Sequence, residues 1–70
     1  MRREKVDSSL AISVGYDALS SILEIEFKPT GAVWRYYNVP ERIFLEMMSG
    51  SIGKYFNTNI KGQYPESQVV

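Results

Sequence analysis

The sequence contains neither cysteine nor histidine among its 70 residues. Without cysteine there is no disulfide framework and no thiolate nucleophile. Without histidine the chain lacks the commonest general base and the commonest side-chain ligand of transition metals. The residue inventory therefore predicts a domain that is not an enzyme and that holds no cofactor and no metal.

Long apolar runs and an excess of charge of one sign are also missing. No segment approaches the ~20 apolar residues that span a membrane, and the charged start MRREKVDSS lacks the apolar stretch of a signal peptide. We therefore expect a cytoplasmic protein without a membrane partner. Eight basic residues balance eight acidic ones, so no general attraction to nucleic acid is expected.

Aromatic side chains are what this short chain has in quantity: five tyrosines, three phenylalanines and one tryptophan. A chain of this length forms one domain with one core, and its stability is limited to a few kcal/mol. Each aromatic ring can bury about 150–250 Å². The aromatics therefore supply much of the expected core.

Strand periodicity dominates the first half of the chain. Residues 9–16 alternate between a large apolar side and a small side. The large side consists of Leu10, Ile12, Val14 and Tyr16, and the small side of Ser9, Ala11, Ser13 and Gly15. The small side either lets another segment pack closely or simply faces water.

Two further strands are predicted before residue 40. Residues 22–27 alternate with Leu23, Ile25 and Phe27 inward, and a Pro-Thr-Gly turn then leads into residues 32–39. In this third strand we place Trp34 and Tyr36 toward the core and Arg35 in water.

Helical periodicity begins at Pro40, which suits the first position of a helix. Apolar residues then recur at helical spacing at Ile43, Phe44, Met47 and Met48. Ser51 is a candidate cap for a second short helix, with Ile52, Tyr55 and Phe56 on one side. The predicted fold class is α+β: a three-stranded antiparallel meander, free to curl, followed by one or two short helices packed on it. Residues 1–7 are predicted to be a disordered N-terminus, residues 8–64 the domain, and residues 65–70 a flexible tail.

Four short motifs, in this order and spacing, resemble the KTSC domain family. They are Ser8-Ser9-x-x-Ile12-x-x-Gly15-Tyr16-Asp17, Leu23-Glu24-Ile25-Glu26-Phe27, Gly31-x-x-x-Arg35-Tyr36-x-x-Val39-Pro40 and Gly53-x-Tyr55-Phe56-Asn57-x-x-Ile60-Lys61. The resemblance covers residues 8–64. It implies a β-meander followed by helix and a non-enzymatic accessory role. Because the family occurs at the C-terminus of some lysyl-tRNA synthetases, it also suggests a contact with RNA.

Glu24 and Glu26 are the only candidates for paired-carboxylate chemistry. At positions i and i+2 of a strand they share one face, with Cα atoms about 6.5–7 Å apart. Pairs of carboxylates near that separation can catalyse acid–base hydrolysis. Alternation with polar residues outward predicts such pairs anyway, so we interpret them as a solvated strand face.

A recognition surface is predicted from basic residues that lie among aromatics. Its members are Arg35, Tyr37, Lys54, Tyr55, Asn57 and Lys61. Aromatic rings beside cations can stack on a base or hold a peptide. Asn57 has an alternative structural role, in which its amide bonds the backbone of a neighbouring strand or loop, and we favour that role. Tyr37 is likewise interpreted first as an ordinary exposed aromatic.

Two classes of function follow. The first is an interaction module that binds a protein partner or forms a homodimer, and it rests on small size, exposed aromatics and open sheet edges. The second is weak binding to RNA or another nucleic acid, in which Arg35, Lys54 and Lys61 would neutralise only a few phosphates. We favour the protein partner.

Overall fold

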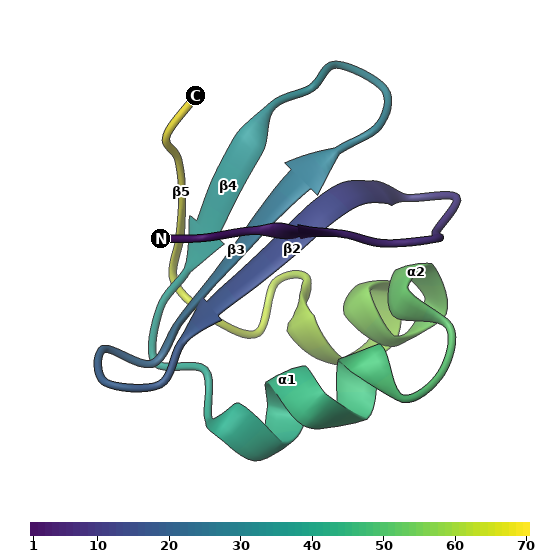
Figure 1. The fold of residues 1–70 in the computed structure, drawn as a ribbon. Helices are drawn as coiled ribbons and strands as arrows, with labels where there is room; N and C mark the ends of the chain where they lie inside the picture. The colour runs from purple at the N-terminus through teal and green to yellow at the C-terminus, as the bar shows by residue number, and fades with distance from the viewer.

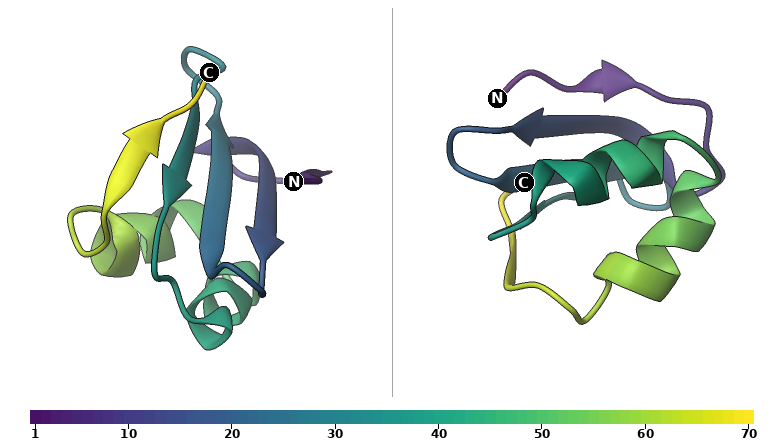
Figure 2. Two further views of the ribbon diagram at one scale, coloured as in Figure 1. Left: turned by 90° about the vertical axis from the view of Figure 1, so that its left-hand side faces the viewer. Right: turned by 90° about the horizontal axis from the view of Figure 1, so that it is seen from below.

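The computed structural model describes all 70 residues as a five-stranded antiparallel sheet with helices on one face (Figures 1 and 2). The strands follow one another in the sheet in the order β1-β2-β3-β4-β5. They are β1 (Glu4–Lys5), β2 (Ala11–Asp17), β3 (Ile22–Phe27), β4 (Val33–Tyr36) and β5 (Glu66–Gln68). The helices are α1 (Glu41–Met48) and α2 (Ile52–Tyr55), and α2 continues into the π-helical turn η1 (Phe56–Ile60). None of these helices has the length and apolarity that crossing a membrane requires.

The predicted α+β class is confirmed, but the prediction of three strands is wrong in number. The two additional strands, β1 and β5, come from the segments 1–7 and 65–70, which the sequence analysis placed outside the domain. Both strands are two or three polar residues long, so neither carries an alternating apolar pattern. They join the sheet through backbone hydrogen bonds to β2 and β4, and such bonds leave no mark in the side-chain pattern.

A β-bulge changes which side chains at the start of β2 face the core. Ala11 is paired with Phe27 and Ser13 with Glu26, so one extra residue, Ile12, is inserted in β2. Ala11 and Val14 are consequently both buried in the core, whereas strict alternation would place them on opposite sides. The predicted phase of residues 9–16 is therefore correct for Val14 and wrong for Ala11.

Helix α1 covers the sheet with the apolar stripe that the sequence predicts. Met47 is completely buried, and Ile43 and Phe44 pack against the core cluster. Phe44 stacks on Tyr16 of β2, with ring centroids 4.9 Å apart and ring planes 9° from parallel. Met48, at the end of the helix, is 38% exposed and lies outside this stripe.

The second helical segment is held by its N-cap and by aromatic contacts with β3 and β4. The Ser51 hydroxyl accepts a hydrogen bond from the Lys54 amide at 3.3 Å, as predicted for an N-cap. Ile52, Phe56 and Ile60 are buried. Phe56 packs edge-on against the rings of Phe27 and Tyr36, each with a centroid distance of 5.4 Å. This contact fixes η1 over the middle of the sheet.

The N-terminal segment passes over the outer face of the sheet at Gly15. A Cβ atom on Gly15 would lie 2.5 Å from the Arg2 carbonyl oxygen, closer than real contacts allow. Of the two interpretations of the small side of β2, close packing is thus the one found. The segment is also tied by a hydrogen bond from the Val6 amide to the Ile12 carbonyl, at 3.1 Å.

Replacing Gly15 with alanine is expected to detach residues 1–7 from β2. The new methyl group would collide with backbone, so β1 must move and lose the hydrogen bonds of Arg3, at a cost of about 1.5–3 kcal/mol. Urea denaturation measures this loss, and the Val6 amide should exchange with solvent rapidly. Gly50→Ala is the control, because its Cβ would meet nothing within 4 Å. Equal stability of both variants would show that the close approach does not matter.

Candidate binding groove

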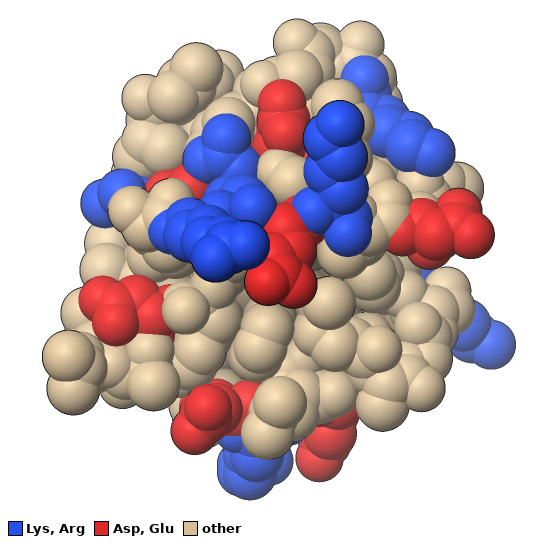
Figure 3. Space-filling view, in the orientation of Figure 1, with Lys and Arg blue, Asp and Glu red and all other residues tan.

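The outer face of the sheet carries a network of ion pairs centred on Glu24. One carboxylate oxygen accepts a hydrogen bond from Arg3 Nη1, and the other accepts one from Arg35 Nε at 2.8 Å. Arg3 also donates to the Ser13 hydroxyl at 3.0 Å, and Ser13 donates to Glu26 at 2.8 Å. Figure 3 shows basic and acidic side chains interleaved on this part of the surface.

Glu24 is only 3% exposed, so the prediction of a solvated strand face is wrong for this residue. The reason is the N-terminal segment, which brings Arg3 over β3. Burial opposes ionisation of Glu24, but hydrogen bonds from Arg35 and Arg3 and their positive charges outweigh it, so the pKa of the Glu24 carboxyl lies below its usual value. The Glu24 carboxylate thus links the N-terminal segment, through Arg3, to β3 and β4.

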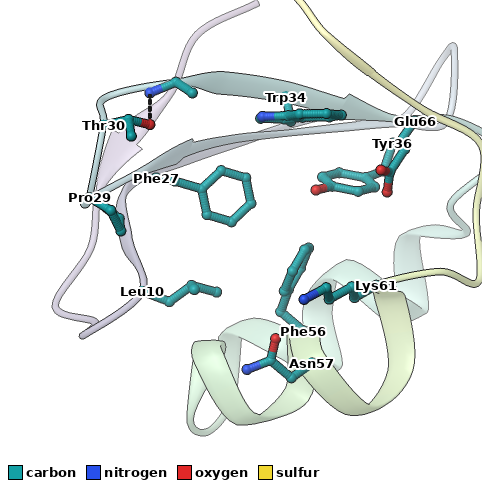
Figure 4. A pocket seen from close by; sticks show the side chains of 11 residues that line it. Leu10, Phe27, Pro29, Thr30, Trp34, Tyr36, Phe56, Asn57, Lys61 and Glu66 are labelled. Carbon is teal, nitrogen blue, oxygen red and sulfur yellow. Dashed lines mark hydrogen bonds between the residues drawn. The ribbon is translucent and has the colours of Figure 1, made fainter.

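An apolar groove of about 360 Å³ lies between the sheet and η1 (Figure 4). Its walls are aromatic: Phe27 from β3, Trp34 and Tyr36 from β4, and Phe56 from η1. Figure 4 shows the Trp34 ring along the underside of the sheet and Phe56 rising toward it from the helix. Asn57, Lys61 and Glu66 add polar groups at its margin. We call this site the aromatic groove.

The aromatic groove exists because the helical layer is shorter than the sheet it covers. Segments α2 and η1 together run only from Ile52 to Ile60, and Phe56 is the residue that reaches the rings of β3 and β4. Tyr36 is buried beneath it, at 3% exposure, while Trp34 is only partly covered. Trp34 and Tyr36 do face the helices, as predicted, but Trp34 lines an open groove.

The polar groups at the margin of the aromatic groove are free to bind. The side chains of Asn57 and Lys61 are exposed, and neither makes a hydrogen bond or an ion pair within the chain. Glu66 likewise forms no ion pair. Burial, with a smaller contribution from the charge of Glu66, raises the pKa of Tyr36 to about 12, so this hydroxyl stays protonated at neutral pH. The groove thus offers an amide, an ammonium group and a carboxylate beside apolar walls.

The six residues of the predicted recognition surface do not form one surface. Arg35 and Tyr37 lie on the outer face, where Arg35 pairs with Glu24 and the Tyr37 hydroxyl hydrogen-bonds Ser67 Oγ at 2.8 Å. Lys54 and Tyr55 line a separate cleft of about 300 Å³, in which the Tyr55 hydroxyl donates to Glu46 at 2.7 Å. Asn57 and Lys61 alone belong to the aromatic groove.

Two interpretations of these residues need correction. Asn57 was interpreted first as a residue that bonds the backbone, but its side chain makes no such bond and faces the groove. Trp34 and Phe27 were placed toward the core, and each of them also lines the groove, together with Phe56. No local sequence signal separates these rings from core residues, because which ring stays partly uncovered depends on how far the helical layer extends over it.

The fold and groove together define a small α+β domain of two layers, and comparisons with known proteins give its family. The KTSC domain matches residues 7–64, so the chain belongs to the KTSC domain family. The crystal structure of a KTSC domain protein from Yersinia pestis superimposes with a TM-score of 0.93 at 37% identity, covering 99% of this chain and 97% of that one.

Relatives in other bacteria match over similar lengths. An uncharacterized protein of Stutzerimonas stutzeri is 38% identical over 65 residues, which is 91% of this chain and 90% of that protein. A protein of Tsukamurella paurometabola is 32% identical over 62 residues, which is 87% of this chain and 91% of that protein. The match therefore extends over nearly the whole length of each relative.

Proposed function

We propose that this chain is a non-enzymatic interaction domain that binds a protein partner through the aromatic groove. The observation that carries the proposal is the partly exposed Trp34 among Phe27, Tyr36 and Phe56, with unpaired polar groups at the margin. Tryptophan and tyrosine dominate the energetics of protein interfaces when they line a pocket that water leaves on binding. A volume of about 360 Å³ is at the lower end for ligand sites, about 300–1,000 Å³, and has room for one large side chain.

The non-enzymatic part of the proposal rests on the state of the ionisable side chains. The sequence has no histidine and no cysteine. Glu24, one of the two candidate carboxylates, is held by two arginines, and Glu26 accepts from Ser13. A general base must be free to reach a substrate proton, and Glu24 is both buried and paired.

The test is selection of peptides that bind the purified chain from a random displayed library. Trp34 is the only tryptophan, so its fluorescence reports occupancy of the aromatic groove. We expect selected peptides to change this emission, and to bind Trp34→Ala and Lys61→Glu at least about tenfold more weakly, as for an interface hot spot. Leu45→Ala is the control, because Leu45 is 56% exposed on α1, outside the groove.

Two results would contradict the proposal. One is that no peptide is enriched on the wild-type chain. The other is that enriched peptides bind Trp34→Ala as tightly as the wild type. Light scattering at the same concentrations tests self-association, and a dimer that Trp34→Ala disrupts would make the partner a second copy of the chain.

A second candidate function is weak contact with single-stranded nucleic acid in the same groove. It is favoured because one groove combines the Trp34 ring with the unpaired Asn57 amide and Lys61 ammonium: bases stack on aromatic faces, and cations contact phosphates. Titration with single-stranded RNA and DNA at low salt, followed by amide chemical shifts, tests it. Unshifted groove amides at high micromolar protein would remove this candidate.

A further inference from the structure

Strand β5 leaves one edge of the sheet open beside the aromatic groove. β5 is the last strand and pairs only with β4. The Tyr37 amide donates to the Pro65 carbonyl at 2.9 Å, and the Val69 amide donates to the Val33 carbonyl at 2.8 Å. Within β5, the backbone groups of the odd-numbered positions therefore point toward β4, and after the strand Val70 also bonds Val33. Because antiparallel strands alternate their bonding directions, the backbone groups of Glu66 and Gln68 point to the open edge.

The two edges of the sheet differ in how they are protected. The β1 edge is crowded with charge, since residues 2–5 read Arg-Arg-Glu-Lys. Charged side chains on an edge strand discourage another strand from pairing there. Residues 66–70 carry a single charged side chain, that of Glu66. The β5 edge is therefore the one suited to accept a further strand.

Glu66 links this edge to the aromatic groove. Its backbone points to the open edge, while its side chain lies on the helix-facing side of the sheet and lines the groove. In a paired strand, the side chain directly opposite lies about 4.5–5.5 Å away on the same face. A strand added to β5 would thus place alternate side chains on the groove side. Lys61, also at the margin, is the cation there without an ion-pair partner.

We propose that the partner segment is an extended peptide that adds to β5 as a sixth strand and inserts an aromatic side chain into the aromatic groove. An acidic residue two positions from that side chain, and so on the same face of the strand, pairs with Lys61. This inference rests on the proposed function and specifies its ligand. Backbone hydrogen bonds to Glu66 and Gln68 supply affinity, and the groove selects the side chain, as in other cases of strand addition.

The probe is an acetylated and amidated heptapeptide of alternating threonine and valine, with a central phenylalanine and an aspartate two residues after it, on the same strand face. Three matched peptides change one feature each: phenylalanine to alanine, aspartate to lysine, and N-methylation of the backbone amide nearest the phenylalanine. We expect the parent peptide to change Trp34 emission and to slow exchange of the Glu66 and Gln68 amides. Each altered peptide should bind at least about tenfold more weakly.

A matched pair of protein variants separates strand addition from groove binding. Gln68→Pro removes an amide that points to the open edge and leaves the bonds of Val69 and Pro65 to β4 in place. It should lose at least about tenfold in peptide affinity. Gln68→Ala keeps that amide and should bind like the wild type. Amide spectra of both variants check that the sheet is unchanged.

Each outcome has a distinct meaning. If peptides bind with a Trp34 response but Gln68→Pro and N-methylation have no effect, strand addition is overturned and groove binding stands. If the heptapeptide fails while peptides without an aromatic residue are selected from the library, the aromatic-peptide chemistry is overturned and the proposed function stands. If no peptide binds, both are overturned. A hexauridylate that shifts the groove amides when no peptide does would assign the groove to nucleic acid.

Discussion

Replacing Glu24 with glutamine is expected to lower the free energy of unfolding by about 3 kcal/mol, a large part of the stability of a 70-residue domain. The wild-type carboxylate accepts from Arg3 on one oxygen and from Arg35 on the other. Glutamine keeps one acceptor oxygen, which can bond one guanidinium group. Its NH₂ group then faces the second guanidinium group, and two hydrogen-bond donors cannot bond each other. The effect falls at the lower end for a broken buried pair because the two arginine side chains are 30% and 36% exposed and regain water.

The loss should depend on pH in a defined direction. The pKa of Glu24 is lower in the folded chain than its usual value, which is about 4.3 in unfolded chains. Its contribution to stability is therefore fully present above about pH 5 and is lost as pH falls through the folded-state pKa. Wild type and Glu24→Gln should differ most near pH 7 and converge in acid.

Urea denaturation at pH 7 and at pH 3 measures both effects. Glu26→Gln is the matched control, since Glu26 lies two residues away on the same strand face and accepts only from Ser13. It should cost less than about 1.5 kcal/mol. If Glu24→Gln and Glu26→Gln cost the same, or if the Glu24→Gln difference is no smaller at pH 3 than at pH 7, the ion-pair network does not stabilise the fold as described.

Side-chain periodicity predicted the parts of this fold that bury apolar residues. Alternation in residues 22–27 puts large side chains on one face of the strand. The helical stripe at Ile43, Phe44 and Met47 does the same for the helix. Folding buries these faces, so their apolar pattern predicts the structure. The strands β1 and β5 bury almost nothing of their own, so no periodicity marks them. They are held by backbone bonds, the Gly15 approach and the Arg3–Glu24 pair. Such contacts depend on where the two ends of the chain lie in the folded structure, and the local sequence does not specify that position.

The candidate site was predicted in fragments for a related reason. Sequence reasoning found Asn57 and Lys61 because they are polar residues near aromatics, and both lie at the groove. It grouped them with Arg35 and Tyr37, which occupy the opposite face of the sheet. Which apolar ring is left partly uncovered depends on the length of the layer above it. Trp34 and Tyr36 share a strand face, yet only Tyr36 lies fully under Phe56.

Met47→Ala is expected to lower the free energy of unfolding by about 3 kcal/mol, within the range of about 2–5 kcal/mol for truncating a buried large side chain. Met47 has no exposed surface and belongs to the cluster that joins α1 to the sheet, with Leu23, Ile25 and Val39. Truncation removes the transfer free energy of its side chain and leaves a cavity between two layers. The urea midpoint should fall without a change in slope, as for a loss of stability alone.

Met48→Ala isolates the effect of burial, because Met48 is the next residue of the same helix and is 38% exposed. Met48→Ala changes helix propensity by the same amount as Met47→Ala. It should therefore alter the free energy of unfolding by no more than about 0.5 kcal/mol. Met47→Leu, which nearly preserves volume, should cost less than about 1.5 kcal/mol. If Met47→Ala and Met48→Ala were equally mild, α1 would not cover the sheet as described.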